Sequence, residues 1–367
     1  MRKSLLLVGA FLTVAAMAQA KEVVPEPVVV EETPVQIVEK EVIVYRDKEE
    51  GFRPNGYVDL QYKYYGDAEE TNYKNDGVEN NYSRTQLMGQ INMTENQSLE
   101  YRIRDYNSLN SRSNDEDTVE EGTQTRLRYF YNHGYLGDSK VNLTSRIHYC
   151  DNVDESQELE YQARFNFAEY MFNNDFIKTD DFTIAPKYMY SWASNSGDYD
   201  NQVGADLYTM HSLPWGFSFE LNIYATQHFY GQDKVTGTND KTDDNFSVDV
   251  EAYIYNTTNL YTSTDGKFGI DFQFEGGFDP YSWNSESILK REYKDNYFED
   301  AVNKTEYEDS KYKLYAWPQI VANYDVTDNF KTYVSLGAEY ANRNQYADDV
   351  NNWRWQPVAV AGFKTTF

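Results

Sequence analysis

Residues 353–367 read Trp-Arg-Trp-Gln-Pro-Val-Ala-Val-Ala-Gly-Phe-Lys-Thr-Thr-Phe, and the chain ends on the aromatic side chain of Phe367. Alternate positions place Trp353, Trp355 and Phe363 on the same face as Phe367. Alternation with a period of two is typical of a strand whose faces meet different surroundings. A last strand that ends in phenylalanine is the usual sorting signal for the outer-membrane assembly machinery. We therefore expect Phe367 to be an assembly signal.

The same alternation recurs along the chain from residue 55. In residues 56–65, for example, Val58 and Leu60 alternate with Asp59 and Gln61. These segments predict an all-β protein, a transmembrane antiparallel β-barrel of about 14 strands within a range of 12–16. An even number of strands places both ends of the barrel on the periplasmic side. The predicted strands lie near residues 56–65, 84–93, 98–107, 123–132, 139–150, 158–168, 182–192, 202–212, 216–228, 245–256, 267–277, 311–323, 330–341 and 353–367.

The connections between these segments fall into two classes. Residues 94–97, 213–216 and 327–329 form short connections, which we expect to face the periplasm. The alternate connections are longer and acidic, and we expect them to be extracellular. Short turns at one end and long loops at the other are typical of an outer-membrane barrel, and a secreted β-sandwich has no reason to sort its loops in this way. The long predicted loops are 66–82, 108–122, 229–244 and 279–309.

The first 20 residues predict export. Arg2 and Lys3 precede an apolar run over residues 5–16, and Ala18-Gln19-Ala20 matches a signal-peptidase site. The apolar run is shorter than the roughly 20 residues that a membrane-spanning helix needs. Residues 21–52, rich in proline, valine and glutamate, predict a periplasmic extension, either a linker or a segment that packs with partner chains or the cell wall. The barrel is then expected over residues 53–367.

Composition supports the same class and excludes another. The mean hydropathy is −0.78, although 16% of the residues are aromatic and 34 are tyrosine. A barrel with a polar lumen, an apolar outer face and aromatic girdles has this composition, and so does a carbohydrate-binding β-sandwich. The net charge of −27 makes nucleic acid a poor partner, because phosphate binding needs clustered positive charge. The single cysteine, Cys150, cannot form an intramolecular disulfide.

The face predicted to point inward carries an unusual number of arginines. Neighbouring strands are about 4.8 Å apart, so arginines on consecutive strands would form a basic ladder on one wall. Facing acidic residues, such a ladder would orient dipolar solutes and select ions by charge. The predicted pore-lining ladder comprises Arg84, Arg102, Arg104, Arg126, Arg128, Arg146 and Arg164. The acidic pore-lining candidates are Asp59, Glu100, Glu160, Glu220, Asp249, Glu251, Asp271 and Glu275.

The lumen could instead be filled by arginines paired with acids, but the strand number favours an open pore. Barrels of about eight strands are just filled by side chains, whereas those of about sixteen hold channels. Catalysis is not indicated, because none of His133, His148, His211 and His228 lies near a Gly-x-Ser-x-Gly motif or in a recognisable His–Ser–Asn arrangement. No cysteine and histidine spacing indicates a metal site. We therefore expect no enzyme activity, no cofactor and no metal.

Several segments resemble the fusobacterial major outer-membrane porins of the FomA type. These are Val-Tyr-Arg-Asp at 44–47, Arg-Pro-Asn-Gly at 53–56, Val-Asp-Leu-Gln-Tyr at 58–62, Arg-Leu-Arg-Tyr-Phe-Tyr-Asn at 126–132, Ser-Lys-Val-Asn-Leu-Thr-Ser-Arg at 139–146, Arg-Trp-Gln-Pro at 354–357 and Ala-Gly-Phe-Lys-Thr-Thr-Phe at 361–367. The resemblance spans the whole chain and is weakest in the loops. It implies a general diffusion porin, a 14-stranded barrel and a homotrimer. Adhesive properties of the family are not carried over, because the loops depart most.

The expectation from sequence is an outer-membrane porin that forms a passive, water-filled channel for small hydrophilic solutes and ions. The alternative is a surface adhesin or structural barrel that acts through its acidic extracellular loops. In either case the expected partners are outer-membrane lipid, lipopolysaccharide and, during biogenesis, the assembly machinery.

Overall fold

The computed structural model describes residues 51–69, 81–109, 119, 121–193, 197–238, 240–295, 302–308, 310–343 and 352–367. Residues 55–366 form one compact unit, and residues 51–54 belong with Phe367 to a second. The predicted signal peptide and nearly all of the predicted extension lie outside the described residues. Both, and the role of Phe367, stay predictions.

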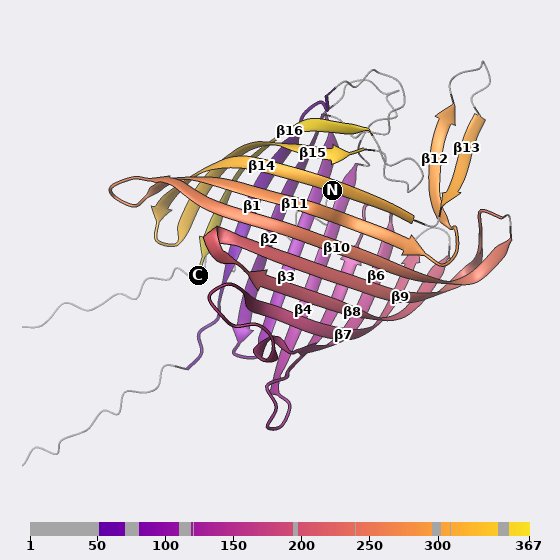
Figure 1. The fold of residues 1–367 in the computed structure, drawn as a ribbon, viewed down its shortest axis with the longest axis horizontal. Helices are drawn as coiled ribbons and strands as arrows, with labels where there is room; N and C mark the ends of the chain where they lie inside the picture. Colours follow the sequence, from indigo (N-terminus) through magenta and orange to yellow (C-terminus); the bar gives the residue numbers. More distant parts are fainter. Residues whose placement is uncertain are drawn as a thin grey trace, which may run out of the picture. The chain divides into compact units, whose positions relative to one another are not determined.

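Fourteen strands close into one antiparallel barrel, drawn in Figure 1. A separate two-stranded sheet, β12–β13, is inserted between β11 and β14. The barrel strands are β1 (Asn55–Tyr65), β2 (Tyr82–Thr94), β3 (Gln97–Ser108), β4 (Gly122–Tyr135), β5 (Asn142–Asp151), β6 (Ser156–Asn166), β7 (Lys178–Ala193), β8 (Tyr199–Ser212), β9 (Phe217–Val235), β10 (Lys241–Thr262), β11 (Phe268–Asn284), β14 (Ser310–Thr327), β15 (Phe330–Asn342) and β16 (Trp353–Thr366). The inserted strands are β12 (Leu289–Asp295) and β13 (Val302–Glu308).

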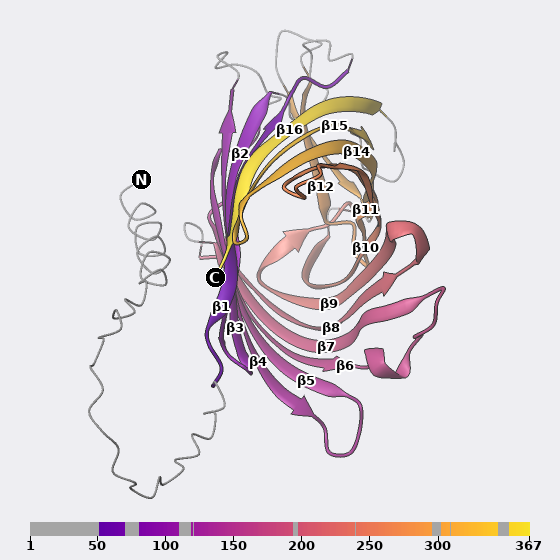
Figure 2. The same ribbon diagram turned by 90° about the vertical axis from the view of Figure 1, so that its left-hand side faces the viewer.

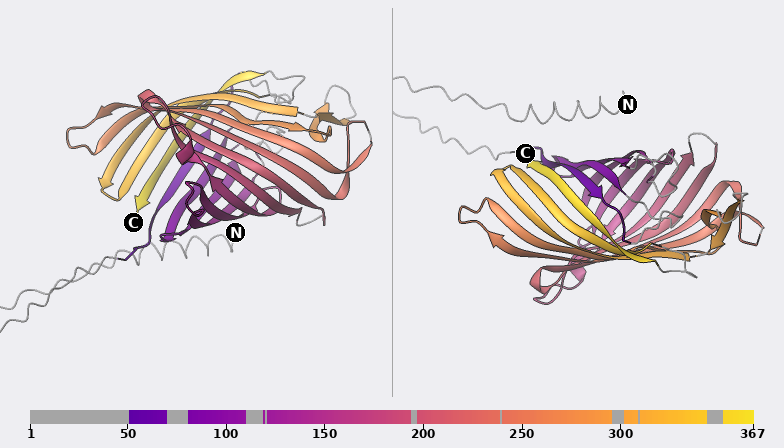
Figure 3. Two further views of the ribbon diagram at one scale, coloured as in Figure 1. Left: turned by 60° about the horizontal axis from the view of Figure 1, so that its bottom comes forward. Right: turned by 90° about the horizontal axis from the view of Figure 1, so that it is seen from above.

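Neighbouring strands follow one another in sequence all around the wall, and the ring closes where β1 pairs with β16. In that closing pair Tyr57 lies opposite Thr366 and Tyr65 lies opposite Val358. The strands run obliquely around the barrel, as Figure 3 shows. Such tilt is required when a twisted sheet closes on itself. The only helical elements in the described part are two 3-10 turns, η1 (Ala168–Tyr170) and η2 (Pro214–Gly216), and none of its helices could cross a membrane.

The predicted fold class and all fourteen predicted barrel strands are confirmed, with boundaries that differ by a few residues at most ends. Two predicted loops differ more. Residues 229–244 are largely strand, because β9 continues to Val235 and β10 begins at Lys241. In the predicted loop 279–309, β11 extends to Asn284 and the β12–β13 sheet follows. The gaps in this loop and in 66–82 and 108–122 lie outside the described residues.

The barrel is polar inside and apolar outside. The largest fully buried side chains are all polar: Gln162, Gln356, Asn342 and Asp206. Large apolar side chains in the middle of strands are instead exposed, among them Val203 at 44%, Ile320 at 45% and Leu336 at 64%. A water-soluble fold buries its apolar side chains, so this distribution is the reverse of that expected for a protein surrounded by water.

A glycine and a tyrosine meet beside the closing strand pair. Tyr333 of β15 lies opposite Gly362 of β16, and Tyr333 Oη donates a hydrogen bond of 2.7 Å to Asp59 Oδ1 on β1. The tyrosine thereby crosses over β16 and ties β15 to β1. A Cβ atom at position 362 would lie 2.6 Å from Tyr333 Oη and 2.7 Å from the carbonyl oxygen of Leu60. Only glycine leaves room for this crossing.

Gly362→Ala should therefore destabilise the barrel by roughly 1–3 kcal/mol, the usual cost of overpacking. The measurement is the urea midpoint of the refolded protein in lipid vesicles, followed by tryptophan fluorescence. Gly51→Ala is the control, because a Cβ at position 51 meets nothing within 4 Å. Equal urea midpoints for the two variants would show that the contact of Tyr333 across Gly362 does not stabilise the closing strand pair.

Candidate functional site

The lumen is the candidate site, and cross-strand register shows which side chains face it. Directly opposite residues of an antiparallel pair share a face. On β1, Asp59 and Lys63 are each 7% exposed, whereas Tyr62 between them is 45% exposed. Asp59 lies opposite Met88, and Met88 lies opposite Arg102, so these three side chains share the inner face. Cross-strand register assigns the inner-face residues of the other barrel strands in the same way.

The predicted arginines occupy consecutive strands of this inner face. Arg102 lies directly opposite Arg126, and Arg128 lies opposite Glu100. Arg84 lies opposite Lys63 on one side and Tyr106 on the other. We call Arg84, Arg102, Arg104, Arg126 and Arg128, from β2, β3 and β4, the arginine wall. Arg146 on β5 and Arg164 on β6 continue the inner face but have different partners.

The arginine wall forms no ion pair in the described part of the chain, in which no carboxylate oxygen lies within 4.0 Å of its guanidinium groups, although the charge of Glu100 acts on Arg126 and Arg128 from a longer distance. Its hydrogen bonds within the described residues go instead to neutral groups, which are side-chain amides and the Tyr106 hydroxyl. Arg102 Nη2 donates to Gln124 Oε1 at 3.0 Å, and Arg104 Nε donates to Gln86 Oε1 at 2.7 Å. The buried Nε atoms of Arg84, Arg102 and Arg128 have no acceptor among the residues that the structure describes. The wall thus carries concentrated positive charge and unused donors.

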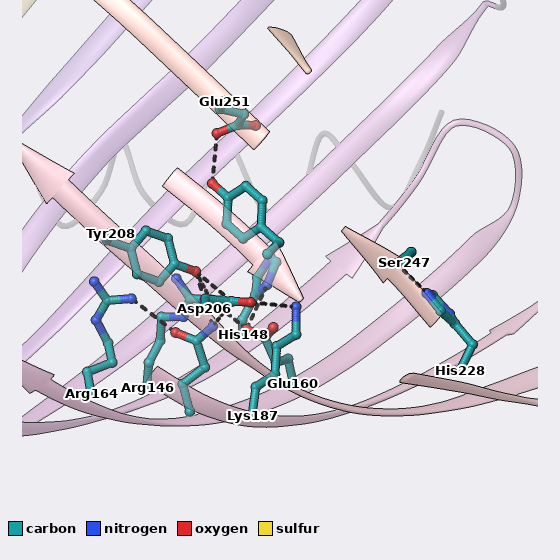
Figure 4. Close-up of polar contacts among 12 residues, drawn as sticks. Arg146, His148, Glu160, Arg164, Lys187, Asp206, Tyr208, His228, Ser247 and Glu251 are labelled. Atoms are coloured by element: carbon teal, nitrogen blue, oxygen red, sulfur yellow. Dashed lines mark hydrogen bonds and ion pairs between the residues drawn. The ribbon is translucent and has the colours of Figure 1, made fainter. Parts of the chain in front are cut away.

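The next strands hold a buried polar network in which each cation has a partner (Figure 4). Arg146 contacts Glu160 at 2.5 Å, and Lys187 Nζ contacts Asp206 Oδ1 at 2.8 Å. Gln162 Nε2 donates to the other oxygen of Asp206 at 2.6 Å. His148 lies 3.8 Å from Glu160, and the Tyr208 hydroxyl donates a hydrogen bond to Asp206. Arg164 donates a hydrogen bond to Gln162, and its guanidinium carbon lies 4.3 Å from the centroid of the Tyr208 ring. These hydrogen bonds and ion pairs link the side chains of β5, β6, β7 and β8.

Four carboxylates on β9, β10 and β11 accept hydrogen bonds from tyrosines and have no cation partner in the described residues. Tyr255 Oη donates to Glu220 at 2.9 Å, and Tyr224 Oη donates to Glu251 at 2.7 Å. We call Glu220, Glu251, Glu275 and Asp279 the acidic wall. Its remaining bonds come from Tyr315 to Glu275 at 2.6 Å and from Tyr253 to Asp279 at 2.9 Å. A tyrosine donor satisfies a carboxylate without neutralising its charge, so this wall stays negative.

The two walls lie across the ring from each other. In the order of the fourteen strands, β3 and β10 are seven positions apart, and so are β2 and β9, and β4 and β11. Figure 2 shows these two groups of strands on different sides of the barrel. In the described residues, no hydrogen bond or ion pair joins β2, β3 or β4 to β9, β10 or β11. Unlike charges therefore face each other without being paired.

The predicted acidic candidates divide between these regions. Glu220, Asp249, Glu251, Asp271 and Glu275 lie on β9–β11, Asp59 lies on β1, and Glu100 and Glu160 lie beside the arginines. Sequence reasoning missed Asp279, which lies at the start of a predicted loop. It also missed Glu339 of β15, which contacts Lys313 at 3.0 Å and Arg343 at 3.4 Å. The alternation around Glu339 could have revealed it, whereas nothing local marks the tyrosine partners.

One arrangement had no sign in the sequence. His228 lies between Asp200 and Ser247, which are 28 and 19 residues away in the chain, and it contacts both. No local motif in the sequence marks this contact, because its three residues come from three different strands. His148 faces the lumen, where it lies opposite Arg128 and 3.8 Å from Glu160. No group of three or more His, Cys, Asp or Glu side chains in the described part is arranged to hold a metal ion.

Comparisons with known proteins give weak similarity. No family model matches the chain, and no curated protein matches it. A structure described as a bacterial polysaccharide outer membrane secretin has 10% identity and a TM-score of 0.39, covering 85% of this chain and 98% of that chain. The outer membrane channel DcaP of Acinetobacter baumannii has 9% identity and a TM-score of 0.37, covering 86% and 96%. Salmonella typhi OmpF in complex with daunomycin has 11% identity and a TM-score of 0.31, covering 86% and 97%.

Lys187→Met tests the buried network. The variant leaves Asp206, whose side chain is 1% exposed, without its cation, and loss of one partner of a buried pair costs roughly 3–5 kcal/mol. The urea midpoint should fall accordingly, and the double variant Lys187→Met with Asp206→Leu should recover much of the loss. Lys178→Met is the control, because its ion pair with Asp180 is exposed and contributes less than about 1 kcal/mol. A Lys187→Met midpoint equal to that of the control would contradict the assignment.

Proposed function

We propose that this protein is an outer-membrane channel through which small hydrophilic solutes and ions diffuse passively, with anions favoured along the arginine wall. The single observation that carries the proposal is the pair of oppositely charged walls that face each other, with no hydrogen bond or ion pair joining them in the described part of the chain. A barrel stabilised by a filled interior would join its walls through such contacts.

The placement in a membrane is supported by the reversal of polarity between the two faces of the sheet. Exposed apolar side chains such as Val203 and Ile320 suit a hydrocarbon environment, whereas buried Gln162 and Asp206 do not. Every strand of the wall pairs with two neighbours, so the closed barrel exposes no sheet edge to lipid. The predicted signal peptide agrees with an outer-membrane location, and so does the resemblance of several strand segments to the fusobacterial outer-membrane porins.

The preference for anions follows from the way the charges are satisfied. Five guanidinium groups are concentrated on β2, β3 and β4, and in the described residues their hydrogen bonds go to neutral amides and to the Tyr106 hydroxyl, while three buried Nε atoms have no acceptor there. An anion that passes along this wall can accept those bonds and needs to displace no carboxylate. Cations find the acidic wall, where tyrosine hydroxyls already occupy one acceptor site on each carboxylate. The arginine wall therefore attracts anions and the acidic wall attracts cations, and the attraction for anions is the stronger of the two.

The alternative of an adhesin acting through its loops has no favouring observation in the described residues. Much of the predicted loops 66–82, 108–122 and 279–309 lies outside those residues. An adhesin also gives no reason for charged walls inside the barrel. The channel is therefore the function that the geometry supports best.

The charge assignment predicts the ion selectivity of the channel. Replacing Arg102, Arg104, Arg126 and Arg128 together by glutamine should shift the reversal potential in a potassium chloride gradient toward the cation, because four unneutralised positive charges leave the lumen. The measurement is the reversal potential of purified protein in planar lipid bilayers, with stepwise conductance as evidence of insertion.

A matched control removes the same number of charges from exposed positions near the short connections. Lys140, Lys178, Lys267 and Lys331 are all exposed, and their replacement by glutamine changes the net charge equally. This control should keep the reversal potential of the unmodified protein. The charge assignment fails if both quadruple variants shift alike, and the channel proposal fails if folded protein gives no conductance.

A further inference from the structure

Three side chains from neighbouring strands form a hydrogen-bonded line inside the barrel, apart from both charged walls. His228 Nδ1 lies 2.7 Å from Asp200 Oδ2, and His228 Nε2 lies 2.9 Å from Ser247 Oγ. Asp200 comes from β8, His228 from β9 and Ser247 from β10, and Figure 4 shows the contact between His228 and Ser247. An acid, an imidazole and a hydroxyl in this order form the constellation that activates serine for nucleophilic attack.

The hydrogen bonds around Asp200 determine the orientation of the imidazole. Gln202 Nε2 donates to Asp200 Oδ2 at 2.8 Å, and the backbone N–H of Phe229 donates to Asp200 Oδ1 at 3.2 Å. An ionised carboxylate only accepts hydrogen bonds, so Nδ1 of His228 carries the proton toward Asp200. Nε2 is then the acceptor for the hydroxyl of Ser247. This is the protonation that a general base needs before it takes a proton from serine.

Polar donors flank the hydroxyl on both sides. Cross-strand register places Thr226 of β9 and Asn284 of β11 directly opposite Ser247. Asn245 Nδ2 donates to Asn284 Oδ1 at 2.6 Å, which fixes the Asn284 amide and leaves its N–H groups without an acceptor in the described residues. The Thr226 hydroxyl likewise makes no hydrogen bond there. Side-chain amides and hydroxyls of this kind can stabilise a developing oxyanion.

The line lies toward the end of the barrel opposite the short connections. Asp200 is the second residue of β8, and β9 continues from His228 to Val235. The side chains of His228 and Asp200 are 18% and 15% exposed, so they are partly shielded but not sealed from solvent. Ser247 itself is 6% exposed, so only a small acyl group has room to approach its hydroxyl.

We propose that Ser247 is a nucleophile that hydrolyses carboxylic esters of small alcohols within the lumen, an activity separate from diffusion through the channel. Ser247 Oγ bonds to the ester carbonyl carbon while its proton moves to His228 Nε2. The oxyanion accepts hydrogen bonds from Asn284 and Thr226. The C–O bond to the alcohol then breaks, and the alcohol leaves with the proton from His228. Water attacks the acyl group by the same route, which releases the acid and restores Ser247. Ester and water thus give acid and alcohol.

The test is covalent labelling of the detergent-purified, folded barrel with a fluorophosphonate, which reacts with activated serines. Labelling should occur at Ser247, as mapped by mass spectrometry, and should disappear in Ser247→Ala. His228→Gln should slow labelling by about 100-fold or more, because the general base is lost. Hydrolysis of 4-nitrophenyl acetate should follow the same order among the variants.

A second lumen serine provides the matched control. Ser282 of β11 donates its hydroxyl to Asp249 but has no histidine partner. Ser282→Ala should keep the labelling rate of the unmodified protein. Should Ser247→Ala not fold, as judged by its gel mobility before and after heating, Ser247→Cys keeps the side-chain size and should also escape the fluorophosphonate.

Asp200 is a positioning residue in this scheme, so its effect must act through His228. Asp200→Asn should reduce the labelling rate, and Asp200→Glu should restore part of it, which loss of packing alone would not produce. The proposal is overturned if folded, unmodified protein labels no faster at Ser247 than at Ser282. Ser247→Ala should keep full conductance, so failure of the hydrolytic proposal and failure of the channel proposal remain distinguishable.

Discussion

The rest of the structure depends on the hydrogen-bond requirement of the backbone. Each strand of a sheet presents N–H and C=O groups on both sides, and in lipid none of them can turn to water. Pairing β1 with β16 removes the last two edges of the barrel, and it leaves each of the fourteen barrel strands with two neighbours. Closure then sorts the side chains by parity, which means that odd and even positions of a strand point to opposite faces, one to the outside and the other to the lumen. The apolar outer face and the charged walls are consequences of that sorting.

Parity explains why so much of the fold could be predicted from sequence. Wherever one face is apolar and the other polar, as in β1 with Leu60 and Asp59, the strand is visible in the residues themselves. The contrast disappears in residues 231–234, Gly-Gln-Asp-Lys, where both faces are polar. Alternation therefore predicts a loop over residues 229–244, where β9 and β10 in fact extend.

The candidate site was predictable in part for the same reason. Parity assigns Arg102 and Arg126 to the lumen, but only register reveals that they lie directly opposite each other. Partners also depend on side chains that reach across strands, as when Gln162 of β6 contacts Asp206 of β8. The Asp200–His228–Ser247 line depends on two registers at once. No local spacing records such information, so charged groups were predicted and their pairing was not.

The pairing of the first strand with the last also determines the order in which the barrel can be completed. Tyr57 and Thr366 are separated by nearly the whole barrel sequence, so their contact can form only after every intervening strand has been delivered. Until then the growing sheet keeps two open edges, which are templates for pairing with other chains. Contacts between distant residues also form slowly. Until β16 pairs with β1, the barrel is therefore open at two edges, and those edges are the part of the sheet that most needs shielding from other chains.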